Sequence, residues 1–292
     1  MANPGKAFEV FNMAAAKYEA LAAGSTRELA RYLIDIAPTL DDESVVLDNA
    51  CGTGIVAQEI LLKRVAAGAS VLPITCVDVA PAMVDIARDV CRGMVESQQG
   101  DANKITAEVM PGENLQIQDD HFTHSFTNQG IMFFKDAAKG SREIIRTLQR
   151  GGTAVVTSWT KFGHVEVVHA AQKAYKPDST LMKFPVAEQW YQASYLERTL
   201  MNAGFAEVDV HEKTVWYAAK SIEELSGLLF GMFVNFPVGW NEEENAGFKK
   251  YLDVEVEKAV VKITRPIAGD VEGKTEDLVG VPMVALVAVA KK

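Results

Sequence analysis

Residues 45–57, VVLDNACGTGIVA, constrain the fold of this chain more than any other stretch. An apolar run ends at Asp48, a turn of small residues with Gly52 and Gly54 follows, and an apolar segment typical of a helix begins directly after it. A glycine-rich turn between a strand and a helix brings backbone N–H groups and the helix N-terminus close to a ligand. The stretch therefore predicts a ligand-binding strand–turn–helix unit.

The same alternation continues along the first half of the chain. Strands are expected over 44–50, 73–80, 105–110, 122–130 and 152–159, and helices over 54–68, 81–98 and 136–152. Two further helices, over 8–22 and 25–38, are expected before them. Strands that alternate with helices through short connections form a mostly parallel sheet with helices on both faces.

The end of the chain follows a different pattern. A helix over 195–205 leads into an alternating strand over 206–217, and an apolar strand closes the chain over 281–292. Between these strands, residues 218–280 form a long insert with an apolar helix over 221–235 and a charged helix over 241–262. Two late strands around an excursion predict an antiparallel pair at one edge of the sheet.

Charge and cysteine content exclude several classes of partner. The formal net charge of -10 argues against nucleic acid or an anionic membrane, which both require clustered Lys and Arg. The three cysteines, Cys51, Cys76 and Cys91, include no C-x-x-C pair and are expected to be reduced thiols of a cytoplasmic protein. Neither a secretory signal nor an apolar run of the ~20 residues needed to cross a membrane is expected.

The turn is compatible with two kinds of cofactor. Gly52, Gly54 and Ala57 satisfy the loose dinucleotide pattern G-x-G-x-x-A, which expects a strand running almost directly into the first glycine. Asp48 instead stands at the strand end, four residues before Gly52. A carboxylate there would repel a pyrophosphate at short range, whereas it suits a ligand that carries an ammonium group. Asp78 ends the next strand, and the carboxyl ends of parallel strands are where such sheets bind ligands.

Residues 48–54, DNACGTG, resemble the first motif of class I S-adenosylmethionine (SAM) dependent methyltransferases. The stretches 76–88, CVDVAPAMVDIAR, and 110–122, MPGENLQIQDDHF, are similar to the family's second and third motifs. The resemblance extends from Tyr18 to about Gly204, and it is nearest to the ubiquinone-biosynthesis branch and to fungal natural-product methyltransferases. It implies a Rossmann-like α/β fold with a mostly parallel seven-stranded sheet, an antiparallel C-terminal strand pair and a helical lid insert.

The resemblance also implies roles for single residues. Asp48 would hydrogen-bond the amino group of the methionine part of SAM, and Asp78 would bind the ribose hydroxyls. Pro111 stands where the third motif usually has Asp, so a backbone contact from the Gly112 loop would replace an acidic contact to the adenine amino group. The remaining implied cofactor contacts are Ala50 and Gly52 at the methionine part, Val79 and Met83 on the adenine, Glu113 and Asn114 at the adenine edge, Asn128 between the methionine end and the acceptor, and Tyr18 over the cofactor.

Candidate acceptor-side residues lie outside these motifs. His164 follows the fifth strand and is a candidate general base, because imidazole titrates near neutral pH; the alternative is a partly exposed loop histidine. The aromatic part of the insert suits either packing on the sheet or a lid over an apolar acceptor. The side chains expected to contact the acceptor are Phe133, Trp159, Met232, Phe233, Phe236 and Trp240.

No metal site is expected from the sequence. The stretch 119–124, DDHFTH, offers Asp119, Asp120, His121 and His124, which are residue types that bind metals. The same stretch enters the predicted fourth strand, where a polar surface turn is expected. Methyl transfer by in-line displacement also requires no metal, so the turn is the preferred interpretation.

Residues and resemblance together predict one methyltransferase domain over 1–292. Its parts would be a helical cap over 1–40, a SAM-binding core over 41–217, a helical lid insert over 218–280 and a final strand over 281–292. The predicted reaction transfers a methyl group from SAM to an O, S or N atom of a small, largely apolar metabolite of secondary metabolism. S-adenosylhomocysteine would be the product, and the protein would be a monomer or homodimer. The alternatives are a SAM-binding enzyme of cyclisation or rearrangement, and a module that only senses SAM.

Overall fold

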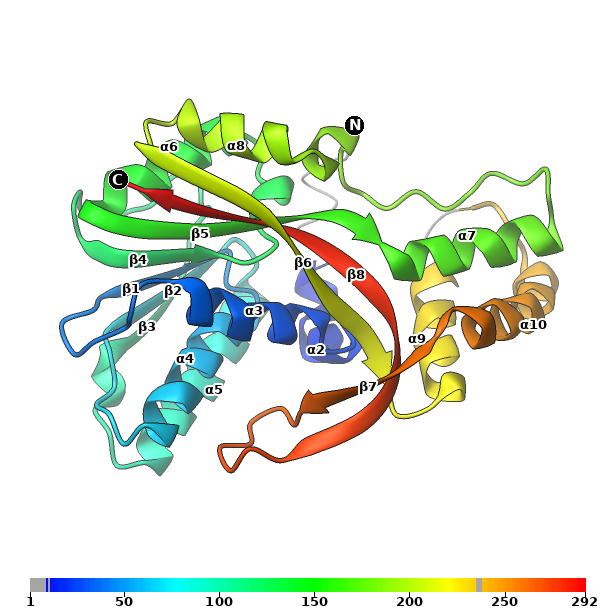
Figure 1. Cartoon of the computed structure of the whole chain (residues 1–292), viewed down its shortest axis with the longest axis horizontal. Helices are drawn as coiled ribbons and strands as arrows, with labels where there is room; N and C mark the ends of the chain where they lie inside the picture. The colour runs from blue at the N-terminus through cyan, green and yellow to red at the C-terminus, as the bar shows by residue number, and fades with distance from the viewer. Residues whose placement is uncertain (1–8, 10, 235–237) are drawn as a thin grey trace.

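A single mixed sheet forms the centre of the computed structural model, which describes residues 9, 11–234 and 238–292. Among these residues the strand order is β3-β2-β1-β4-β5-β8-β6, and β7 pairs with β8 away from this path (Figure 1). The strands are β1 Val46–Asn49, β2 Ile74–Asp78, β3 Ile105–Val109, β4 Phe122–Thr127, β5 Leu148–Phe162, β6 Glu207–Ala219, β7 Val261–Pro266 and β8 Thr275–Lys291. Strands β1 to β5 pair in parallel, whereas β8 is antiparallel to β5, β6 and β7.

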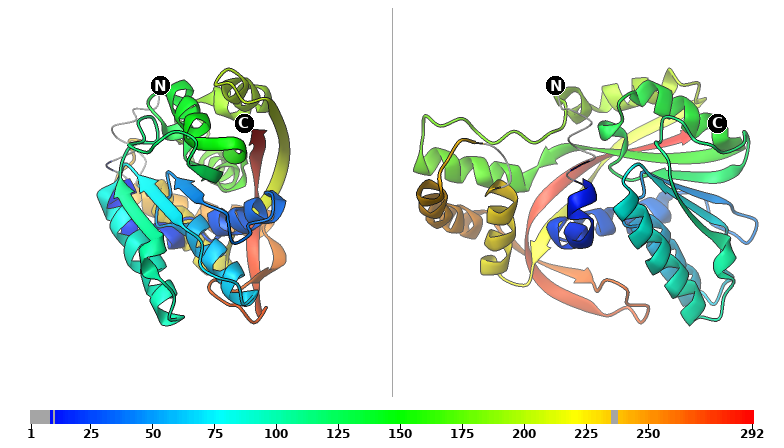
Figure 2. Two further views of the ribbon diagram at one scale, coloured as in Figure 1. Left: turned by 90° about the vertical axis from the view of Figure 1, so that its left-hand side faces the viewer. Right: turned by 180° about the vertical axis from the view of Figure 1, so that it is seen from behind.

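Helices cover both faces of this sheet. Figure 2 shows α4 and α5 on one side and α6 and α8 on the other, while α7, α9 and α10 gather at the far end of the long strands. The helices are α2 Tyr18–Leu21, α3 Ser25–Ile36, α4 Ile55–Ala66, α5 Pro81–Ser97, α6 Ala137–Thr147, α7 Gly163–Tyr175, α8 Ala193–Met201, α9 Ile222–Val234 and α10 Glu242–Ala259. Short 3₁₀ turns are η1 Ala15–Lys17, η2 Ala102–Lys104, η3 Ile131–Phe133 and η4 Glu188–Tyr191.

The strand order places the binding crevice. All of β1 is buried, as expected for a parallel strand covered on both faces. It lies between β2 and β4, so the connections that leave β1 and β4 run to opposite sides of the sheet. Open α/β sheets bind ligands at this reversal, beyond the carboxyl ends of the strands. The ends of β1, β2 and β4 therefore define where a ligand site should lie.

The predicted Rossmann-like α/β class with an antiparallel C-terminal pair is confirmed, but two elements were not predicted. The sheet has an eighth strand, β7, which occupies part of the insert that was expected to be helical, and β8 begins at Thr275 rather than at 281. Helix α7 occupies residues that were expected to be a loop after the fifth strand. Among the described residues, no helix has the length and apolarity to cross a lipid bilayer.

Candidate functional site

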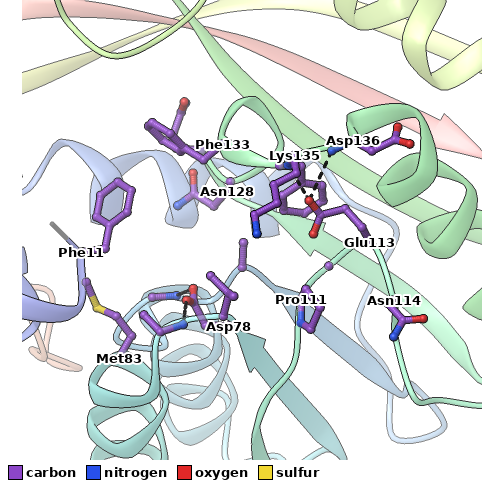
Figure 3. Close-up of a pocket in the computed structure, with 18 of the residues that line it drawn as sticks. Phe11, Asp78, Met83, Pro111, Glu113, Asn114, Asn128, Phe133, Lys135 and Asp136 are labelled. Carbon is purple, nitrogen blue, oxygen red and sulfur yellow. Dashed lines mark hydrogen bonds between the residues drawn. The ribbon is translucent and has the colours of Figure 1, made fainter. Parts of the chain in front are cut away.

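A pocket of about 700 Å³ opens at the carboxyl ends of β1, β2 and β4 (Figure 3). It brings together every residue predicted to contact the cofactor except Asp48, and it includes Phe133 from the predicted acceptor contacts. The predicted residues in its lining are Tyr18, Ala50, Gly52, Asp78, Val79, Met83, Gly112, Glu113, Asn114, Asn128 and Phe133. Segments that are distant in the sequence thus meet at the edge where the strand order predicts a site.

The glycine-rich turn and Asp78 form the floor of the pocket. Ala50, Gly52 and Gly54 have left-handed backbone conformations, with φ of 54°, 54° and 78°. The Gly52 N–H donates to Asp78 Oδ2 at 2.9 Å, and the Ala80 N–H donates to Asp78 Oδ1 at 2.9 Å. Burial raises the pKa of the Asp78 carboxyl, although these N–H donors oppose the rise. Asp78 is therefore fixed in place at the centre of the floor.

Asp48 lies beneath the turn rather than on the pocket wall. Its carboxyl is 1% exposed, Oδ2 accepts the Ala57 N–H at 3.1 Å, and Oδ1 has no partner among the described residues. Burial, reinforced by the nearby Asp78, raises its pKa to about 7. An unpaired carboxylate oxygen directly below the turn fits a ligand that brings a hydrogen-bond donor or a positive charge. The direct contact that the resemblance implies for Asp48 stays a prediction.

The Gly112 loop approaches the turn closely from the other side. A Cβ atom on Gly112 would lie 2.3 Å from Phe134 Cζ and 2.8 Å from Asn49 Oδ1, so only glycine fits there. Glu113 Oε1 accepts the N–H of Lys135 at 2.6 Å and is 3.5 Å from the Asp136 nitrogen. This oxygen of Glu113, which was expected at the adenine edge, thus supports the loop that follows η3 (Figure 3).

Several lining residues were not predicted from the sequence. Phe11 meets Phe133 edge-on at 5.1 Å between ring centroids and Tyr18 at 6.1 Å, which forms an aromatic wall. Lys135 extends from the opposite wall towards the centre of the pocket (Figure 3). The run 131–136, IMFFKD, directly follows the end of β4, and that position at the carboxyl edge of the sheet was the signal that could have identified it.

Asn128 and Tyr18, two residues of the pocket wall, are restricted by their surroundings in the hydrogen bonds or proton transfers that they can offer a ligand. Asn128 Nδ2 donates to the Thr26 carbonyl at 3.0 Å, and its Oδ1 lies 3.4 Å from the Thr157 hydroxyl. Burial raises the pKa of Tyr18 to about 12, and the nearby Asp78 and Glu19 add to the rise. The Tyr18 hydroxyl therefore stays protonated at neutral pH, where it can donate a hydrogen bond but cannot act as a base.

His164 does not lie in the pocket lining. It sits in the first turn of α7, 4% exposed, stacked on Tyr217 at 4.9 Å, with Nδ1 2.7 Å from Met283 Sδ. Burial lowers its pKa to about 3. A buried ring that is neutral throughout the physiological range and does not line the pocket does not fit the general-base role that we expected for it. The alternative, a partly exposed loop histidine, is also wrong.

The other predicted acceptor contacts pack away from this pocket. Phe233 is fully buried, with its ring 4.2 Å from Phe248 and 5.3 Å from Trp240. Trp159 is buried on β5, 5.8 Å from Phe162. These residues and Met232 are absent from the pocket lining, and Phe236 lies outside the described residues. The geometry favours the packing interpretation of the insert over the lid interpretation.

The four side chains of the predicted surface turn take separate partners. Asp119 pairs with Arg146 at 2.6 Å and Asp120 with Lys292 at 2.7 Å. His121 Nδ1 lies 3.1 Å from Gln118 Nε2, and His124 Nε2 lies 3.2 Å from the Pro38 carbonyl. Within the described ranges, no group of three or more His, Cys, Asp or Glu residues could hold a metal ion.

The chain is similar to known methyltransferases. Residues 47–156 match the family model of a methyltransferase domain. Methyltransferase ktnA of Aspergillus niger is 25% identical over 75% of this chain and 76% of its own length. Acetylaranotin bis-thiomethyltransferase of Aspergillus terreus is 22% identical over 91% and 90%, and the UbiE C-methyltransferase of Geotalea daltonii is 27% identical over 72% and 92%. Alignments to two other fungal methyltransferases span only 58% and 57% of those relatives.

Solved structures share the fold at low sequence identity. A SAM-dependent methyltransferase of Thermotoga maritima superposes with a TM-score of 0.52 and 15% identity, over 98% of this chain and 99% of that one. The [4+2]-cyclase SpnF superposes with a TM-score of 0.52 and 19% identity, over 91% and 81%. The sequence matches to the fungal methyltransferase ktnA and to UbiE confirm the predicted resemblance to these two groups.

Proposed function

We propose that this chain transfers the methyl group of SAM to an O, S or N atom of a small, largely apolar metabolite. Residues 47–156 match the family model of a methyltransferase domain, and the chain shares its fold with a SAM-dependent methyltransferase. The pocket is the observation that most supports this proposal. Its floor carries the predicted cofactor residues, and its wall adds aromatic rings that no predicted cofactor contact requires. Sites for small molecules combine apolar walls with a few fixed polar groups. The names of the fungal relatives support a place in secondary metabolism.

The residues of the floor suit SAM as the bound group. Asp78 holds two backbone N–H donors and still offers carboxylate lone pairs to ribose hydroxyls. Asp48 is buried beneath the turn, and its Oδ1 has no partner among the described residues, so it can accept a hydrogen bond from an ammonium group that reaches it. Val79 and Met83 supply apolar surface for a base. When bound, SAM supplies an electrophilic methyl group on a sulfonium.

The protein's own contribution is to orient the acceptor and exclude water. Tyr18, Phe11 and Phe133 form one wall, so an apolar acceptor that packs on them is desolvated beside the cofactor site. With His164 buried elsewhere, no histidine is among the described lining residues. Acceptors that ionise readily, such as thiols and phenols, need little help from a base. We therefore favour an S or acidic O nucleophile over a neutral alcohol.

The test is a turnover assay with three matched acceptors, an aromatic thiol, a phenol and an amine of the same size. We expect S-adenosylhomocysteine together with a methylated product, with the thiol fastest, and loss of both in Asp78→Ala. Mass spectrometry distinguishes the alternatives. An isomerised product without S-adenosylhomocysteine would indicate a cyclisation or rearrangement, the class to which the structural neighbour SpnF belongs. Binding of NAD(P) without binding of SAM would contradict the proposal.

A further inference from the structure

Arg27, in α3, is the centre of a buried charged cluster that the proposed reaction does not use. The residue is 8% exposed. Its Nη1 donates to Glu59 Oε1 at 2.6 Å, and its Nη2 donates to Gln58 Oε1 at 2.7 Å and to Glu19 Oε2 at 2.8 Å. Arg31 donates to the second oxygen of Glu59 at 2.7 Å. We call Glu19, Arg27, Arg31, Gln58 and Glu59 the Arg27 cluster.

The Arg27 cluster joins the two sides of the cofactor pocket. Glu19 belongs to α2 and directly follows Tyr18, which lines the pocket. Gln58 and Glu59 belong to α4, the helix that begins at the glycine-rich turn. Gln58 Nε2 donates to the Thr53 carbonyl at 2.8 Å, within the turn itself. One guanidinium thus connects the segment that covers the pocket to the turn that forms its floor.

The two halves of the Arg27 cluster differ in exposure. The Glu59 side chain is 6% exposed and is held by two arginines, whereas the Glu19 side chain is 42% exposed and is held by one. Breaking a buried ion pair leaves an uncompensated charge and is costly, but a half-exposed carboxylate can return to water. The Glu19–Arg27 pair is therefore the contact that can open while the rest of the cluster stays intact.

The segment that carries Tyr18 is placed so that it can move. Residues 15–24 lie between the cofactor pocket and a second pocket of about 310 Å³, whose lining includes Glu19, Ala23 and Arg27. The segment joins α3 through Ala23 and Gly24, two successive left-handed residues with φ of 45° and 75°. Arg265 of β7 donates to the Ala23 carbonyl at 3.0 Å and anchors this turn. The turn is therefore held in place, and the second pocket leaves space behind the segment.

We propose that Arg27 is a positioning residue for the cofactor, whose ion pair with Glu19 holds the Tyr18 segment closed over the pocket. This inference rests on SAM as the cofactor of the proposed function. Opening of the pair releases the segment towards the second pocket, and the cofactor leaves through the uncovered side. The pair therefore controls how fast cofactor and product dissociate, while the bound geometry stays unchanged.

The probe is S-adenosylhomocysteine, and the variant is Glu19→Gln, which removes the charge from the half-exposed partner. Its control is Glu43→Gln, an exposed glutamate shortly before the amino end of β1, whereas the cofactor pocket lies at the carboxyl end of that strand. We expect the Kd of Glu19→Gln to rise about two- to fivefold, through faster dissociation in a displacement experiment. Glu43→Gln should bind as the native protein does, and Glu19→Asp should fall between the two. Thermal unfolding without ligand should be alike in all variants, which separates positioning from folding.

Salt supplies a second readout, because a half-exposed pair is screened. Raising NaCl from about 50 mM to about 500 mM should speed dissociation from the native protein and from Glu43→Gln, but have less effect on Glu19→Gln. Equal dissociation rates for Glu19→Gln and Glu43→Gln, or equal salt responses, would overturn the positioning role and leave the cofactor assignment standing. A native protein that binds neither SAM nor S-adenosylhomocysteine would overturn both.

Discussion

Asp78 in the pocket floor and Asp48 beneath the glycine-rich turn differ in how their carboxyl oxygens are hydrogen-bonded. Both oxygens of Asp78 accept backbone N–H groups, whereas Asp48 has one oxygen with a partner and one without. Burial raises the pKa of both, and that of Asp48 to about 7. Near neutral pH the free protein therefore holds Asp48 partly protonated, ready to ionise when a positive charge arrives above it.

The raised pKa of Asp48 predicts how the free energy of unfolding depends on pH. The pKa of Asp48 rises from 3.8 to about 7 on folding, so the native state binds more protons than the unfolded state between these values. The free energy of unfolding should therefore fall as pH rises from about 4 to about 7. Above pH 7, Asp48 is ionised in both states and should cause no further decrease. Asp48→Asn should lose less stability than the native protein from pH 4 to 7, by at most about 4 kcal/mol.

Urea unfolding of both proteins at several pH values between about 4 and 8 measures this difference. Asp89→Asn, an exposed carboxylate on α5, is the matched control and should keep the native pH dependence. If the curves for the native protein and Asp48→Asn stay parallel over the whole range, Asp48 is ionised in the native state and the burial argument fails.

Single site residues could be predicted from the sequence where the backbone geometry requires a particular residue type. The turn, Asp78 and the Gly112 loop were predictable because small residues and strand ends meet at one edge of a parallel sheet. His164 was misjudged because burial against Tyr217 and Met283 depends on strands that are distant in the sequence. Phe11 and Lys135 were missed because loop residues reach a pocket only through tertiary packing.

Among the elements, α7 and β7 show what local pattern cannot reveal. Residues 163–175 include three valines, which have low helix propensity, and the helix exists because it packs against α10. Gly163 lets this helix begin beside β8, since a Cβ there would lie 2.0 Å from the Pro282 carbonyl oxygen. Among the described strands, β7 pairs with β8 alone, residue for residue from Val261 to Pro266. Its alternating, mostly exposed side chains lacked the apolar signal of a core strand.

Two glycines, one in α5 and one packed against it, should respond in opposite ways to substitution by alanine. Gly93 is exposed in the middle of α5, and a Cβ there would meet nothing within 4 Å. Gly93→Ala should stabilise the protein by about 0.5–1 kcal/mol, because alanine loses less entropy in a helix. Gly54 packs against the same helix with φ of 78°, and its Cβ would lie 3.0 Å from Ala87 Cβ.

Gly54→Ala should therefore destabilise the protein by at least about 1 kcal/mol and weaken SAM binding, since the turn must shift. Urea unfolding and calorimetry with SAM measure the two effects for both variants. A destabilised Gly93→Ala, or a Gly54→Ala variant that binds SAM normally, would show that the turn and α5 adapt to a side chain more easily than their spacing indicates.

On the scale of the whole molecule, two long antiparallel strands connect the cofactor core to the helices at the far end. Strand β8 pairs with β6 over Val279–Lys291 and with β5 over Met283–Lys291. The same strand packs against α7 and α9 and pairs with β7 (Figure 1). In the described chain, residues 218–280 contact the rest of the molecule through β7, α9 and α10. If the chain is one domain, as the sequence predicts, these residues should unfold together with the cofactor core.

Unfolding in urea should follow one transition for both parts of the molecule. Far-UV circular dichroism reports mainly the helices and sheet, whereas the fluorescence difference between the native protein and Trp240→Phe reports the insert, where Trp240 packs on Phe233 and Phe248. Coincident midpoints are the criterion for a two-state unit. S-adenosylhomocysteine at a hundred times its Kd should stabilise both signals by about 2.7 kcal/mol, because a ligand of the core stabilises everything that unfolds with it. An insert signal that is lost at lower urea, or that does not respond to the ligand, would mean that α9 and α10 unfold as a separate unit that only rests on the strands.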